Sequence, residues 1–203
     1  MQTNFAENLS RAQQVKQSDV ALLLTPRLTM MPMPMARYDD PFLPFGKTII
    51  DATKDLVCAY VFDLAAYLAI GAAGAVALER TVAYVGEGTI KILHGPFASA
   101  DYAAAASDNA FNVDAVTVTD IQYMPAYLQQ ANMGAFVLVR GQSAKYDVMG
   151  NVYWPDEGAF TVVVADQPPR RIRLAGEDVL YAGRGEDFTE RVRGALKAIR
   201  DAR

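Results

Sequence analysis

The stretch from Leu56 to Thr119 constrains the fold more than any other part of this chain, because apolar runs alternate in it with helical patterns. Leu56–Phe62 is a continuous apolar run, which is typical of a strand buried on both faces. Leu64–Arg80 then carries apolar residues at helical spacing. The alternation continues with a strand over 89–93, a helix over 99–111 capped by Ser99, and a strand over 115–119. Because each crossover is long enough to return the chain parallel, this pattern predicts a parallel sheet, either open or closed into a barrel.

Polar residues stand just beyond these strands. Asp63, His94 and Asp120 follow the three strands, and Asp101 opens the second helix. Ligands of parallel α/β folds bind beyond the carboxyl ends of the strands, so these residues are candidates to line a site. A histidine beside carboxylates can do acid–base chemistry, although His94 also fits a simple turn residue before Gly95.

Composition narrows the class of protein. The 203 residues have a net charge of −4 and are 52% hydrophobic, which suits one domain over 1–203 with a sizeable core. No basic stripe indicates nucleic-acid binding, and the single Cys58 excludes an internal disulfide. The apolar helical pattern is too short for a bilayer, and the start lacks a signal-peptide pattern. We therefore expect a cytoplasmic protein without membrane insertion.

The segment 25–46 is rich in proline and methionine. It follows an expected short helix from Phe5 to Ala12 and an expected strand over Val20–Leu24. Long loops are uncommon in compact domains, and methionine adapts to irregular apolar surfaces. Two interpretations stay open, a lid over the domain's own core or a contact with a partner. The methionines concerned are Met30, Met31, Met33 and Met35.

The character of the chain changes in its C-terminal third. A short helix near 125–131 and a buried strand over 135–140 precede this part. Asn151–Trp154 and Ala159–Val164 are typical of strands joined by the turn-like Pro155–Gly158. Further short strands are expected over 172–174 and 179–182, and a final helix from about Glu186 onward.

Five segments of the sequence resemble the orotidine 5'-monophosphate decarboxylase family in their order and spacing. The resemblance is greatest to the long bacterial branch of that family. The five segments are Ile49–Tyr60, Ala77–Val85, Asp114–Val118, Gly134–Arg140 and Leu180–Phe188. The resemblance covers about residues 45–142 and 179–203, is weak over 1–44 and is absent over 143–175. It implies an α/β fold of the (β/α)8 TIM-barrel type, shortened or rebuilt in the C-terminal third, where 143–178 diverges.

The family's catalytic motif has no counterpart here. The resemblance implies a decarboxylase that needs no cofactor or metal and carries Asp-x-Lys-x-x-Asp at a strand end, where the lysine protonates the carbon as carbon dioxide leaves. In this chain His94 stands at the first aspartate, Pro96 at the lysine, and Ala98 or Ser99 near the second aspartate. Proline cannot donate a proton, so the resemblance does not carry the activity over.

The family's other functional positions also differ. Thr25-Pro26 lacks the acid that contacts the ribose, and Val61 stands at a lysine position. Gln142 replaces a serine that binds the base, and Glu177 replaces an arginine that holds the phosphate. A carboxylate at a phosphate position repels the ligand.

The first hypothesis is therefore a non-catalytic relative that acts as a scaffold, assembly subunit or binding module. An alternative is an enzyme of different chemistry at the old barrel mouth. Two further alternatives are an active orotidine decarboxylase and a sequence that has drifted or been designed without a selected function. We expect no cofactor and either a homo-oligomer or a place in a larger complex, because a shortened barrel would leave strand edges to cover. The candidate mouth residues are Asp63, His94, Asp101, Asp120, Arg140 and Gln142.

Overall fold

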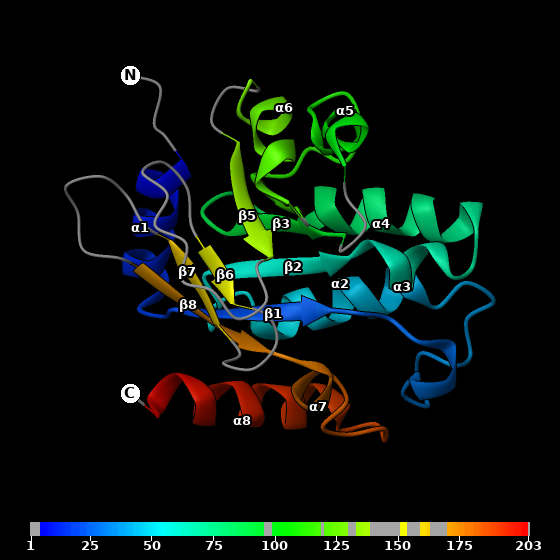
Figure 1. Ribbon diagram of the computed structural model, residues 1–203. Helices are drawn as coiled ribbons and strands as arrows, with labels where there is room; N and C mark the ends of the chain where they lie inside the picture. Colours follow the sequence, from blue (N-terminus) through cyan, green and yellow to red (C-terminus); the bar gives the residue numbers. More distant parts are fainter. Residues whose placement is uncertain are drawn as a thin grey trace.

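The chain folds into a closed barrel of eight strands (Figure 1). The computed structural model describes residues 5–95, 99–118, 120–129, 133–138, 151–153, 159–162 and 170–202. The strands are β1 (Val20–Leu24), β2 (Ala59–Asp63), β3 (Ile90–His94), β4 (Ala115–Val118), β5 (Gly134–Leu138), β6 (Asn151–Tyr153), β7 (Ala159–Val162) and β8 (Arg170–Ala175). The predicted TIM-barrel-like α/β fold is confirmed.

The C-terminal third is rebuilt, as predicted. The pairs from β1 to β6 are parallel, and β8 pairs parallel to β1. Only β7 is reversed, because it pairs antiparallel to both β6 and β8. The described strands therefore close into a barrel through the reversed β7, and the expectation that a shortened barrel leaves strand edges unpaired is wrong for these strands.

The helices surround the parallel part of the barrel. The α-helices are α1 (Phe5–Lys16), α2 (Phe42–Thr53), α3 (Leu64–Leu68), α4 (Ala72–Tyr84), α5 (Ala103–Ala106), α6 (Met124–Leu128), α7 (Glu177–Leu180) and α8 (Phe188–Asp201). Three short 3-10 turns complete the described part, η1 (Leu28–Met30), η2 (Ala100–Tyr102) and η3 (Ile121–Tyr123). None of the described helices is both long enough and apolar enough to cross a membrane.

Two apolar clusters hold this arrangement. One fills the barrel with alternate strand residues such as Leu23, Val61 and Ile92, and α1 adds Phe5 and Leu9 to it. The other lies between the strands and the helices, and Leu22, Phe62 and the buried residues of α8 belong to it. Because side chains alternate along a strand, the first cluster identifies the inward positions.

Three predicted elements differ from the structure. The helix expected over Leu64–Arg80 is broken into α3 and α4 at Gly71, whose φ of +69° is a conformation that glycine adopts without strain. The helix expected over 99–111 shrinks to η2 and the single turn of α5, and Ser99 makes no side-chain cap. The strand expected over 179–182 is the short helix α7, since β8 already fills that place in the barrel.

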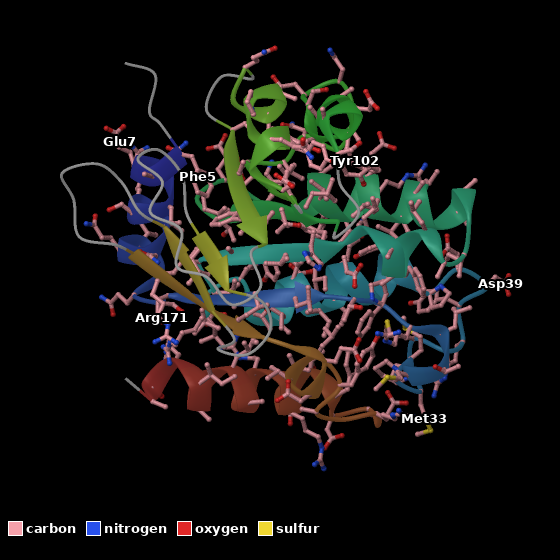
Figure 2. All side chains as sticks on the ribbon, viewed as in Figure 1. Phe5, Glu7, Met33, Asp39, Tyr102 and Arg171 are labelled. Carbon is pink, nitrogen blue, oxygen red and sulfur yellow. The ribbon has the colours of Figure 1, made fainter. Side chains whose placement is uncertain are left out.

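The Met/Pro-rich segment after β1 packs largely on its own domain. Met31 and Met35 are buried in the outer apolar cluster, and α2 already begins at Phe42. Met33 is 61% exposed and lies at the periphery (Figure 2). The interpretation as a lid over the core therefore holds for Met31 and Met35, while a partner contact stays a prediction for Met30 and Met33.

Candidate functional site

Polar side chains form one layer at the carboxyl end of the barrel. Asp63 and His94 end β2 and β3 and are paired in register. Thr25 follows β1, and Thr117 lies next to the end of β4. All four continue the inward positions of their strands, directly above the apolar filling of the barrel. This polar layer is the candidate site.

Asp63 is held by two neighbours. Its Oδ2 accepts a hydrogen bond from Thr25 Oγ1 at 3.3 Å, and its Oδ1 accepts from the backbone N–H of Ala66 at 3.2 Å. The second bond caps the first turn of α3, which is the usual role of an aspartate before a helix. The carboxylate thus has a structural task as well as a place at the mouth.

His94 is buried and bonded to the next strand. Its Nδ1 lies 3.0 Å from Thr117 Oγ1, which also accepts a hydrogen bond from the N–H of Gly95 at 3.0 Å. Burial lowers the pKa of His94, and the charge of Asp63 opposes that shift only in part. The imidazole is therefore neutral at pH 7, and it can accept or donate a proton only against the cost of burial.

The layer contains no lysine. The lysines of the described residues belong to α1, α2, the turn after α2, the amino end of β3 and α8. Val61, which stands at a family lysine position, is fully buried inside the barrel. What the layer offers is one carboxylate, one neutral imidazole and two hydroxyls, a set that can bind polar groups or exchange a proton.

The other predicted site residues do not join this layer in the described structure. Asp101 is exposed in η2. Asp120 is exposed, and its Oδ1 accepts a hydrogen bond from the N–H of Gln122 at 3.0 Å within the same turn. Arg140 and Gln142, like Pro96 and Ala98, lie outside the described residues. The sequence reasoning missed Thr25 and Thr117, which the alternation of inward residues along β1 and β4 could have found.

Glu177 has an ion-pair partner. Arg27, from the segment after β1, donates through Nε to Glu177 Oε1 at 2.8 Å and through Nη2 to the same oxygen. This contact raises the pKa of Arg27. The N–H of Arg27 donates to the hydroxyl of Tyr181 at 2.8 Å. An arginine is therefore present beside position 177, but it comes from another segment and is engaged by the carboxylate.

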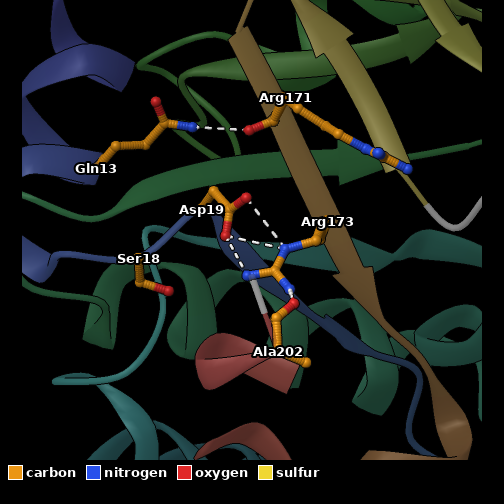
Figure 3. A pocket seen from close by; sticks show the side chains of 6 residues that line it. All are labelled: Gln13, Ser18, Asp19, Arg171, Arg173 and Ala202. Atoms are coloured by element: carbon orange, nitrogen blue, oxygen red, sulfur yellow. Dashed lines mark hydrogen bonds and ion pairs between the residues drawn. The ribbon is translucent and has the colours of Figure 1, made fainter. Parts of the chain in front are cut away.

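The amino end of the barrel carries an open cavity of about 490 Å³ between α1, β8 and the end of α8 (Figure 3). Arg173 spans it, donating to both carboxylate oxygens of Asp19 and to the carbonyl of Ala202. Gln13 Nε2 donates to the carbonyl of Arg171 at 2.9 Å. These contacts join chain segments across the cavity and engage Asp19, Arg173 and Gln13. Within the described ranges, no cluster of His, Cys, Asp and Glu could hold a metal ion.

The fold and this layer define a β/α-barrel protein whose described mouth residues form a polar layer without lysine. Its sequence is 31% identical over 176 residues to orotidine 5'-phosphate decarboxylase of Herpetosiphon aurantiacus, covering 82% of this chain and 65% of that protein. It is 28% identical to the Roseiflexus castenholzii enzyme of the same name, covering 98% of this chain and 97% of that protein. A crystal structure from Toxoplasma gondii, named orotidine-monophosphate-decarboxylase, superposes with a TM-score of 0.60 at 28% identity, covering 69% of this chain and 50% of that one.

These similarities support membership of the chain in the orotidine 5'-phosphate decarboxylase family. No family model matches the sequence. The chain spans 65% of the length of the Herpetosiphon relative. The Roseiflexus alignment runs over 264 positions, more than the 203 residues of this chain, so that relative carries internal segments that this chain lacks. This difference agrees with a barrel rebuilt around a reversed β7.

Proposed function

We propose that this chain is a family member that does not decarboxylate orotidine 5'-monophosphate and serves as a scaffold, assembly subunit or binding module. The observation that carries the proposal is the absence of the motif in which the family's proton-donating lysine stands. No Asp-x-Lys-x-x-Asp occurs in the 203 residues, because none of the six lysines has an aspartate two positions before it. Departing carbon dioxide leaves a carbanion, and an ammonium group beside it supplies both charge and proton.

The polar layer offers no substitute for that ammonium. His94 is the only group of the layer that can become a cation, and burial lowers its pKa, which favours the neutral imidazole at pH 7. Arg27 lies just outside the layer and is bonded to Glu177. A guanidinium remains protonated at neutral pH and is a poor proton donor.

A spectrophotometric assay with orotidine 5'-monophosphate tests this proposal. The protein should be made in a host lacking its own decarboxylase, with an active relative as the positive control. We expect no turnover above background. Turnover that disappears in His94→Asn would overturn the proposal, whereas turnover unchanged by that substitution would indicate a contaminating enzyme.

An enzyme of different chemistry at the mouth is the second candidate. The observation in its favour is the pairing of Asp63 with His94 on adjacent strands inside the barrel. A carboxylate beside a neutral imidazole can move a proton from a small polar substrate. Catalysis of any reaction with a bell-shaped pH profile that is lost in both Asp63→Asn and His94→Asn would favour this candidate over the scaffold.

The proposed role also implies a binding partner, either a second copy of this chain or another protein of a complex. Three of the seven exposed large apolar side chains among the described residues, Leu28, Met33 and Tyr38, lie in the segment after β1. Single exposed residues of this kind do not by themselves define an interface. Light scattering of the pure protein, followed by co-purification from its source, tests for an oligomer or a complex. A well-behaved monomer without a partner in its source would contradict this part of the proposal.

A further inference from the structure

Two segments that leave neighbouring strands lie against each other at the carboxyl end of the barrel. The strap, defined here as residues 27–40, follows β1, and the catch, defined as residues 177–187, follows β8. Because β1 and β8 are paired and parallel, both segments start from the same edge of the barrel (Figure 1). They are far apart in sequence, so their contacts are specific to the closed barrel.

Besides the hydrogen bond from the N–H of Arg27 to the hydroxyl of Tyr181, three links join the strap to the catch. The first is the ion pair of Arg27 with Glu177. The second is a backbone hydrogen bond of 2.8 Å from the N–H of Met33 to the carbonyl of Arg184. The third is the ion pair of Arg37 with Glu186, at 3.0 Å.

The two ion pairs among these links are weak because their side chains are exposed to solvent. The side chains of Arg27 and Glu177 are 51% and 38% exposed, and those of Arg37 and Glu186 are 72% and 68% exposed. Ion pairs this accessible are screened by salt and add little stability each. By contrast, all five residues of β1 are buried in the barrel. The links to the catch can therefore break while the barrel stays folded, and the burial of Met31 and Met35 is then what holds the strap.

One residue connects the strap to the polar layer. The hydroxyl of Tyr181 accepts from the N–H of Arg27 and donates to the carbonyl of Thr25 at 3.1 Å. Thr25 Oγ1 in turn donates to Asp63. The Tyr181 ring is fixed by stacking on Phe45, with centroids 5.8 Å apart and planes 6° from parallel. A movement of the strap thus reaches Asp63 through Thr25.

We infer that the strap is a salt-sensitive latch, which releases from the catch as a unit and transmits its state to Asp63 and His94 through Tyr181 and Thr25. Met31 and Met35, which are buried in the outer apolar cluster, return the strap to its closed position. The latch sets the geometry of the mouth through the segment after β1, whether or not the chain decarboxylates orotidine 5'-monophosphate.

Hydrogen exchange on the full chain at 0.05 M and 1 M NaCl tests the latch. We expect the N–H groups of Met33 and Ala36 to exchange about three to ten times faster at high salt, while the N–H of Cys58, bonded to Val20 in the barrel, does not change. Glu186→Gln should produce the same acceleration at low salt. Asp187→Asn is the matched control, because Asp187 pairs with Arg191 in α8 and not with the strap.

The coupling to the mouth has its own readout. His94 is the only histidine of the chain, so its ring protons give a single set of NMR signals. We expect these signals to shift in Tyr181→Phe and in Glu177→Gln, and to stay unchanged in Asp187→Asn. The inference would be overturned if the strap amides exchanged only at the rate of the Cys58 amide. It would also be overturned if the His94 signals did not shift in either Tyr181→Phe or Glu177→Gln.

Discussion

Arg173 and Asp19 join the last strand of the barrel to the entrance of the first. Arg173 Nη2 lies 2.6 Å from Asp19 Oδ1, and Nε lies 3.0 Å from each carboxylate oxygen. The same guanidinium donates to the carbonyls of Ile199, Arg200 and Ala202 at the end of α8. The Arg173 side chain thus links β8 to the residue before β1 and also caps the C-terminal end of α8.

Replacing Arg173 by methionine should lower the free energy of unfolding by about 2–4 kcal/mol, because a partly buried carboxylate and three carbonyls lose their donor. Urea unfolding followed by circular dichroism measures this. Arg171→Met is the matched control, since Arg171 is exposed on the same strand and its guanidinium points away from Asp19 (Figure 3). The control should change stability by no more than about 0.5 kcal/mol. Equal losses in both variants would contradict the role given to Arg173.

Stability should depend on pH through His94. Burial holds the pKa of His94 in the folded chain below its ordinary value of 6.5. The unfolded chain therefore binds more protons than the folded one between these two pKa values, and stability rises with pH across that window. The contribution is complete above about pH 6.5 and is lost as the pH falls below it.

The difference between wild type and His94→Gln isolates this contribution. Unfolding free energies measured from pH 5 to pH 8 should show a steeper rise with pH for the wild type. Parallel curves for the two proteins would mean that His94 titrates alike in the folded and unfolded chains.

Two glycines in helices should respond to alanine in opposite ways. A Cβ on Gly74 in α4 would lie 1.8 Å from the carbonyl oxygen of Tyr67, so Gly74→Ala should destabilise the protein by about 2 kcal/mol or more. A Cβ on Gly194 in α8 would meet nothing within 4 Å, so Gly194→Ala should stabilise it by about 0.5–1 kcal/mol. Thermal unfolding of both variants checks the pair, and a stable Gly74→Ala protein would show that α3 and α4 can move apart.

Uridine monophosphate should not bind measurably. Glu177 places a carboxylate where the family resemblance calls for an arginine, and Arg27 is already bonded to it. Calorimetry should therefore give no saturable heat, and Glu177→Arg alone should not create binding, because the new guanidinium would face Arg27. Saturable low-micromolar binding that weakens when residues around Glu177 are changed would show that a phosphate pocket persists.

The sequence predicted the barrel well because its strands are continuous apolar runs. The predictions for β1 and β4 matched the structure to within one residue. Short segments were harder, since the four residues 179–182 are apolar enough for a strand or a helix turn, and only the position of β8 decides between them. The candidate site was found in part: Asp63 and His94 follow strands, whereas Thr25 and Thr117 became visible only when the inward face of each strand was known.

The reversed direction of β7 affects anion binding in a way that does not depend on any side chain. In barrels whose strands all run one way, phosphate is commonly held by the loops that follow the seventh and eighth strands. Here the last residue of β7, Val162, lies beside Arg170, which begins β8 at the opposite end of the barrel. The connection that follows β7 therefore starts at the amino end of the barrel, and not at the carboxyl end where phosphate would bind. The direction of β7 alone removes one of the two loops of such a phosphate site, independently of the residue at position 177.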